Sequence, residues 1–111
     1  MPRRALGLVA LVALVASVGV SAADAVGAAR ALLAAWHEEP ARIDRARDLL
    51  ETAVAADPTP AALVELSRVW FLTGDFRARA DADRLAAYER GSAAASRAVF
   101  RATQRLSLIH I

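Results

Sequence analysis

The sequence contains no cysteine and no lysine, and only 5% of its residues are aromatic. Without cysteine the chain has no disulfide bond, no thiolate metal site, no cysteine nucleophile and no lipid attached through a thiol. All 14 basic residues are therefore arginine, and they stand against 12 acidic residues. The fold must consequently be held together by packing, hydrogen bonds and arginine–carboxylate pairs.

Alanine, leucine and arginine are abundant, within a hydrophobic content of 57%. These are strong helix formers, and 111 residues give room for one small domain, so we predict an all-α fold. The formal net charge is +2, but without Arg3 and Arg4 the remaining 12 arginines are balanced by 12 acids. Nucleic acid is disfavoured as a partner, because this part of the chain has no net charge and its arginines are not interleaved with aromatic residues.

Residues 1–23 have the pattern of a bacterial secretory signal peptide. Arg3 and Arg4 precede an uncharged run over residues 5–20, and cleavage fits equally well after Ala23 or after Ala25. Sixteen helical residues rise about 24 Å, short of the roughly 30 Å hydrocarbon core of a membrane. We therefore expect a periplasmic or secreted mature protein with no membrane span, and a retained inner-membrane anchor is the alternative.

Hydrophobic periodicity predicts helices over residues 24–39, 41–57, 59–72 and 77–105. Pro40 ends the first helix, and Gly91–Ser92 divides the last one. Thr59 is the expected N-cap of the third helix, Pro60 its first residue, and Gly74 its left-handed end.

Each helix has an apolar face expected to meet the core. In chain order these faces are Ala28, Ala31, Leu32, Ala35 and Trp36; Ile43, Ala46, Leu50, Ala53 and Val54; Leu63, Leu66, Val69 and Trp70; and Leu85, Tyr88, Ala95, Val99 and Phe100.

The order of small and large residues matches the 34-residue helical hairpin of tetratricopeptide repeats. With Pro58 as the closing proline, Leu33–Ala34 form the large–small pair of one helix, and Ala46, Leu50 and Ala53 form the set of the next. Helix axes approach closely only where side chains are small. We therefore predict an all-α fold of antiparallel helical hairpins, a tetratricopeptide-like α-solenoid over residues 24–105.

A second unit opens after Pro58, but its last small residues return only around residues 91–98, roughly twelve residues later than the period requires. The run LSRVWFLTGDF, a polar stretch rich in arginine and aspartate, and then AAYERGSAAASRAV together resemble the TatT family. These are tetratricopeptide-type periplasmic proteins associated with tripartite ATP-independent periplasmic (TRAP) transporters. The family's Tyr-Glu-Lys-Gly step is matched by Tyr88, Glu89 and Gly91, with Arg90 in place of lysine.

This resemblance covers about residues 41–99 and implies a non-catalytic, periplasmic protein-interaction module. It also implies a solute-binding protein of a TRAP transporter as the partner, a small ligand to be delivered, and self-association of the full-length protein. The missing lipidation cysteine departs from the family pattern. A generic exported tetratricopeptide scaffold of the cell envelope is the alternative.

We expect the repeat region to be incomplete, because about three repeats are needed to bury both faces of such a stack. Residues 106–111 depart from the alanine- and arginine-rich composition and resemble a translated sequencing adapter. We therefore expect an N-terminal fragment and exclude this tail from functional arguments.

No Ser/His/Asp set, glycine-rich phosphate loop or carboxylate pair is found, so the sequence predicts no catalytic residue, no cofactor and no enzyme. His37 is followed by Glu38 and Glu39, but neighbouring residues on a helix point in different directions and no second histidine stands at ligand spacing. A solvated helix end is therefore preferred to a metal site.

Two candidate contact surfaces remain. Trp70 and Phe71 cannot point the same way on a helix, so if Trp70 faces the core, Val64, Arg68 and Phe71 lie along the other flank, where repeat proteins hold ligands. Arg97, Arg101 and Arg105 repeat every four residues and form a basic stripe suited to an acidic protein partner. Packing between repeats and a solvated face are the respective alternatives.

Overall fold

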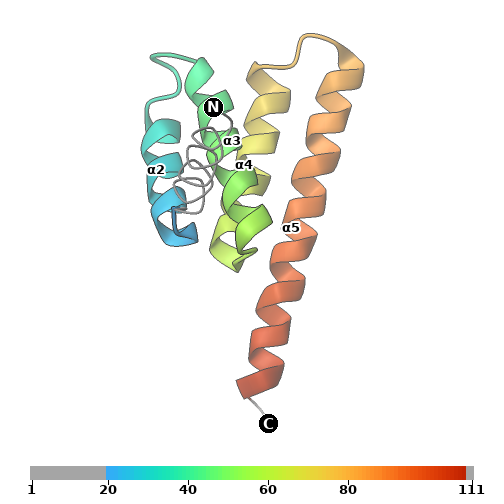
Figure 1. Cartoon of the computed structure of the whole chain (residues 1–111). Helices are drawn as coiled ribbons and strands as arrows, with labels where there is room; N and C mark the ends of the chain where they lie inside the picture. The colour runs from blue at the N-terminus through green and yellow to red at the C-terminus, as the bar shows by residue number, and fades with distance from the viewer. Residues whose placement is uncertain (1–19, 110–111) are drawn as a thin grey trace, which may run out of the picture.

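A computed structural model describes residues 20–109, which fold into four α-helices. They are α2 (Ala22–Ala34), α3 (Ala41–Ala56), α4 (Pro60–Phe76) and α5 (Asp81–Ile109), and successive helices run in opposite directions (Figure 1). The prediction of an all-α fold is confirmed. The expected signal peptide lies almost wholly outside the described residues, as do residues 110–111.

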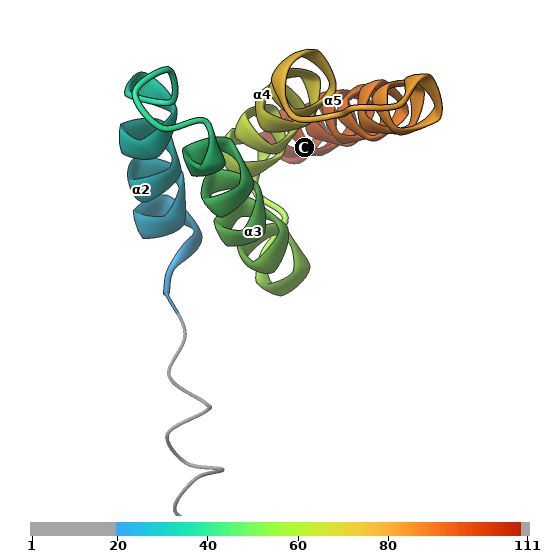
Figure 2. The ribbon, with the colours of Figure 1, turned by 90° about the horizontal axis from the view of Figure 1, so that it is seen from above.

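Each helix packs against the next one along the chain, and α2 also packs against α4. The view from above shows α2 and α3 on one side and α5 on the other, with α4 between them (Figure 2). Within the described part of the chain α3 and α5 do not contact each other. Both flank α4, so the surface of α4 between them is open.

Local capping explains where the helices begin. The Ser21 hydroxyl accepts a hydrogen bond from the Asp24 amide at 3.1 Å, and the Thr59 hydroxyl accepts one from the Ala62 amide at 3.2 Å. Pro60 takes the first helical position, where its missing N–H costs nothing. The predicted start of α4 is thus confirmed.

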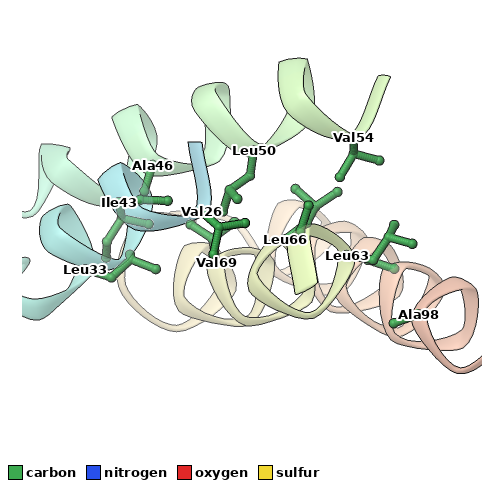
Figure 3. Close-up of a cluster of buried hydrophobic side chains, with 13 residues drawn as sticks. Val26, Leu33, Ile43, Ala46, Leu50, Val54, Leu63, Leu66, Val69 and Ala98 are labelled. Atoms are coloured by element: carbon green, nitrogen blue, oxygen red, sulfur yellow. The ribbon is translucent and has the colours of Figure 1, made fainter. Parts of the chain in front are cut away.

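The core lies where α2, α3 and α4 meet, and α5 adds small residues to it (Figure 3). Ile43, Ala46 and Leu50 of α3 are fully buried, as are Leu63 and Val69 of α4. All five positions predicted for α3 are buried, and Trp70 is half-buried. The apolar faces of the two central helices were therefore predicted correctly.

The predicted apolar face of α2 is only partly correct: Leu32 and Trp36 pack against the core, whereas Ala28 and Ala31 are exposed. Its buried residues are Ala25, Val26, Ala29 and Leu33, whereas Ala34 is exposed. The helix ends at Ala34, and a turn over residues 35–38 brings Trp36 against Phe76, with ring centroids 4.3 Å apart. The buried small residues of α2 are Ala25 and Ala29, nine and five positions before Ala34, which the 34-residue spacing selects.

The ends of α4 and α5 also differ from the prediction. No described glycine has positive φ, and α4 continues through Gly74 to Phe76. Gly91 lies inside an unbroken α5, so neither glycine ends or divides a helix. Both glycines are instead buried where α4 and α5 approach each other.

The face of α5 that packs is lined by small residues rather than large ones. Ala87, Gly91, Ala94 and Ala98 are buried against α4. Leu85, Val99 and Phe100, which were predicted to be buried, are exposed by 58%, 67% and 62%. Small side chains let the two helix axes approach, and the large ones are turned outward because α5 is covered on one side only.

Candidate functional site

Trp70 lies at the centre of a polar cluster between α3, α4 and α5. Its indole N–H donates to Glu51 Oε1 on α3 at 2.7 Å. The Arg47 guanidinium carbon lies 5.2 Å from the centroid of the ring, and that of Arg90 on α5 lies 4.8 Å from it. A half-buried indole with one hydrogen-bond partner and two cations at this range is an amphipathic contact point.

One end of this cluster is fixed by ion pairs that join α3 to α4. Arg77 donates to both carboxylate oxygens of Asp44, with the shortest distance 2.8 Å, and Arg47 lies 3.3 Å from the same carboxylate. Arg47 also donates to the Thr73 hydroxyl at 3.0 Å. The hydrogen bond from Arg77 holds the pKa of Asp44 below its ordinary value, against the opposing effect of burial.

Trp70 forms the floor of an open groove, here called the Trp70 groove, which runs over α4 between α3 and α5. Two adjoining hollows that share Glu51, Trp70 and Arg90 make up this groove. Its residues are Asp44, Arg47, Asp48 and Glu51 of α3; Leu66, Trp70 and Thr73 of α4; Arg77, Ala78 and Arg79 of the following turn; and Asp83, Ala86, Ala87, Arg90, Ala93, Ala94 and Arg97 of α5.

The five residues of the predicted contact surfaces are placed at different parts of this architecture. Arg97 lines the Trp70 groove, and Arg101 is exposed four residues further along α5. Val64 and Phe71 are exposed by 54% and 39%, and neither lines the groove. Arg68, also exposed, lies 3.6 Å from the Glu65 carboxylate. The two stripes therefore do not form one surface.

Phe71 is partly covered by α5. Its ring lies 6.0 Å from that of Tyr88, and a Cβ at Gly91 would lie 3.1 Å from it. Tyr88 in turn donates to Asp75 Oδ1 at 2.5 Å, and this hydrogen bond raises the pKa of Tyr88. Phe71 therefore packs against α5 through Tyr88 and Gly91, and the rest of its side chain is exposed.

Two polar features were not identified from the sequence. Glu65 is 6% exposed, and Arg30 on α2 donates to its Oε1 at 2.9 Å, while its buried Oε2 accepts no hydrogen bond. The pairing of Trp70 with Glu51 joins residues 19 apart in the chain. A buried tryptophan N–H generally needs a hydrogen-bond acceptor, so an acceptor for Trp70 could be expected from the sequence. The sequence does not indicate which residue that acceptor is.

The acidic end of the first predicted helix is engaged by arginines. Glu38 lies 2.9 Å from Arg42, and Glu39 lies 2.9 Å from Arg45. Among residues 20–109, no group of three or more histidine, cysteine, aspartate or glutamate side chains could hold a metal ion. Within the same residues no helix has the length and apolar character needed to cross a membrane.

Comparisons of this chain with protein-family models, with curated proteins and with solved structures gave no match.

Proposed function

We propose that this chain is a non-catalytic, exported protein-interaction module built from tetratricopeptide-like helical hairpins and similar to the TatT family. The observation that carries the proposal is the Trp70 groove: α3 and α5 flank α4 without touching, and the indole between them is half-exposed. Tryptophan and arginine are the residues most enriched at the energetic centres of protein interfaces. The groove presents both.

The packing order supports the hairpin part of the proposal. In a stack of helical hairpins each helix contacts its neighbours along the chain, and the first helices of successive hairpins contact each other. Here α2 contacts α3 and α4, and α4 contacts α5. Ala46 and Ala53 are buried at the positions where the repeat requires small residues, whereas the exposed Ala34 and the 29-residue α5 depart from it.

The role in transport rests on the resemblance over residues 41–99 and on the signal-like N-terminus. In this proposal the mature chain works in the periplasm or is secreted. It binds the solute-binding protein of a TRAP transporter, and the full-length protein self-associates. It needs no cofactor.

Export is tested by expressing the full chain with a C-terminal tag in a Gram-negative host and sequencing the N-terminus of the product. A new N-terminus at Asp24 or Val26 supports export with cleavage. A product that keeps Arg3 identifies a retained anchor and contradicts the cleaved form.

Partner binding is tested by biosensor titration of the purified chain with TRAP solute-binding proteins. Arg90→Ala removes a groove contact from an exposed side chain that touches Trp70, and Phe71→Ala is the matched change on the other flank. Loss of binding with Arg90→Ala alone places the contact in the groove, and loss with Phe71→Ala alone places it on the surface of Val64, Arg68 and Phe71. If no solute-binding protein binds, the transport role is wrong.

A further inference from the structure

The two sides of the Trp70 groove carry opposite charges that do not neutralise each other. On α5, Arg90 and Arg97 take part in no ion pair within the described residues. On α3, Asp48 likewise has no ion pair there, and Glu51 accepts only the indole hydrogen bond. Asp83, near the start of α5, and Arg47 of α3, which pairs with Asp44, also line the groove. The groove therefore has a basic edge at Arg90 and Arg97 of α5 and an acidic edge at Asp48 and Glu51 of α3.

The basic edge has a regular spacing. Arg90, Arg97 and Arg101 stand seven and four residues apart, so they form one stripe along α5, since both intervals are close to whole helical turns. Ala86, four residues before Arg90, and Ala93, between Arg90 and Arg97, are exposed on the groove side of α5. Small residues between long ones let another helix axis approach closely.

The bottom of the groove is apolar at its centre. Leu66 is 4% exposed and Trp70 is half-buried beside it. A helix laid over Trp70 would pack on α3, α4 and α5 at once, and would cover the part of Trp70 that is still exposed. Its affinity must come mainly from this apolar contact, because exposed ion pairs contribute little each. The charged edges set its orientation.

We propose that the Trp70 groove binds one α-helix of a partner protein, with acidic residues along the edge that faces α5 and basic residues along the edge that faces α3. This inference rests on the proposed function and gives the chemistry of the partner. A helix antiparallel to α5 would meet Arg101, Arg97 and Arg90 with acidic residues at intervals of four and seven. Its central face would be apolar and would cover Trp70.

The test uses the full chain and synthetic, fluorescently labelled helical peptides in anisotropy titrations. One peptide has an alanine- and leucine-rich central face, glutamates at the intervals given above on one edge and lysines on the other. A second peptide has lysines on both edges. We expect the first to bind and the second to bind at least tenfold more weakly.

Charge reversal on α5 supplies the decisive comparison. Arg97→Glu with Arg101→Glu should weaken binding of the glutamate-edge peptide at least tenfold and should strengthen binding of the all-lysine peptide. Both side chains are exposed, and circular dichroism checks that the variant remains helical. Arg105→Glu is the matched control, because Arg105 lies on the same helix but beside Thr59 and Pro60, outside the groove; it should change binding less than twofold.

Three results would overturn the inference. They are no binding of the glutamate-edge peptide, binding that Arg97→Glu with Arg101→Glu leaves unchanged, and equally tight binding of poly-glutamate, which would show simple charge attraction. If the peptide fails but a solute-binding protein binds and Phe71→Ala abolishes that binding, the groove inference is wrong and the proposed function stands. If the peptide binds and no solute-binding protein does, the transport role alone is wrong.

Discussion

Gly74 is the position where the packing of α4 against α5 is most sensitive to a single methyl group. A Cβ on Gly74 would lie 2.5 Å from Cε1 and 2.8 Å from Cδ1 of Tyr88. The ring cannot simply move away, because its hydroxyl donates to Asp75 and its other neighbour is the ring of Phe71. Overpacking of this kind costs about 1–3 kcal/mol, whereas glycine to alanine in a helix returns about 1 kcal/mol.

We therefore expect Gly74→Ala to lower the free energy of unfolding by up to about 2 kcal/mol, the difference between these two effects. Urea denaturation of the full chain, followed by far-UV circular dichroism, measures it. Gly27→Ala is the matched control: nothing lies within 4 Å of its added Cβ, so it should gain about 0.5–1 kcal/mol. Gly91→Ala, with its Cβ 3.1 Å from Phe71, should fall between them. A Gly74→Ala protein as stable as Gly27→Ala would refute the close approach of α4 and α5.

Three further outcomes are expected. Asp44→Asn should lower the free energy of unfolding by about 0.5–1 kcal/mol at neutral pH, since the Asp44–Arg77 ion pair is partly exposed. Folding lowers the pKa of Asp44 from 3.8. In urea denaturation at a series of pH values, the stability difference between the two proteins should therefore persist above pH 3.8 and vanish as the pH falls through the lower pKa of the folded state. Tyr88 is the single tyrosine, and its ultraviolet absorbance titration should have a midpoint above 10.0 that Asp75→Ala moves back toward this value. Leu63→Ala should cost about 2–5 kcal/mol in urea denaturation, whereas Leu85→Ala, 58% exposed, should change stability by less than about 0.5 kcal/mol; equal losses would contradict the outward face of α5.

The parts of the fold that the sequence predicted depend on strong local signals. Pro58 lies between α3 and α4, Pro60 takes the first position of α4, and the Thr59 hydroxyl caps that helix. The apolar face of α3 stands out because charged residues surround Ile43 and Leu50. Such features act within one or two turns of helix, so they can be recognised without knowing what packs against the element.

The face of α5 could not be predicted in the same way, because alanine occurs on every side of this helix. Hydrophobicity then favours the large residues Leu85, Val99 and Phe100 as core, whereas the packed face uses small residues. Gly91 was misinterpreted for a related reason. A glycine that breaks a helix and a glycine that admits a neighbouring helix look the same until the partner, here Phe71, is known.

The candidate site depends on this last distinction. A break at Gly91–Ser92 would place Arg97 and Arg101 on a separate helix, with no fixed relation to Arg90. Because α5 is continuous, all three arginines share one stripe, and the close packing of Gly91 against Phe71 holds that stripe beside Trp70. The basic edge of the groove is therefore a consequence of the small residues on the adjacent face of its own helix. A substitution at Gly74 or Gly91 that separates α4 from α5 should weaken the groove, although neither glycine lines it.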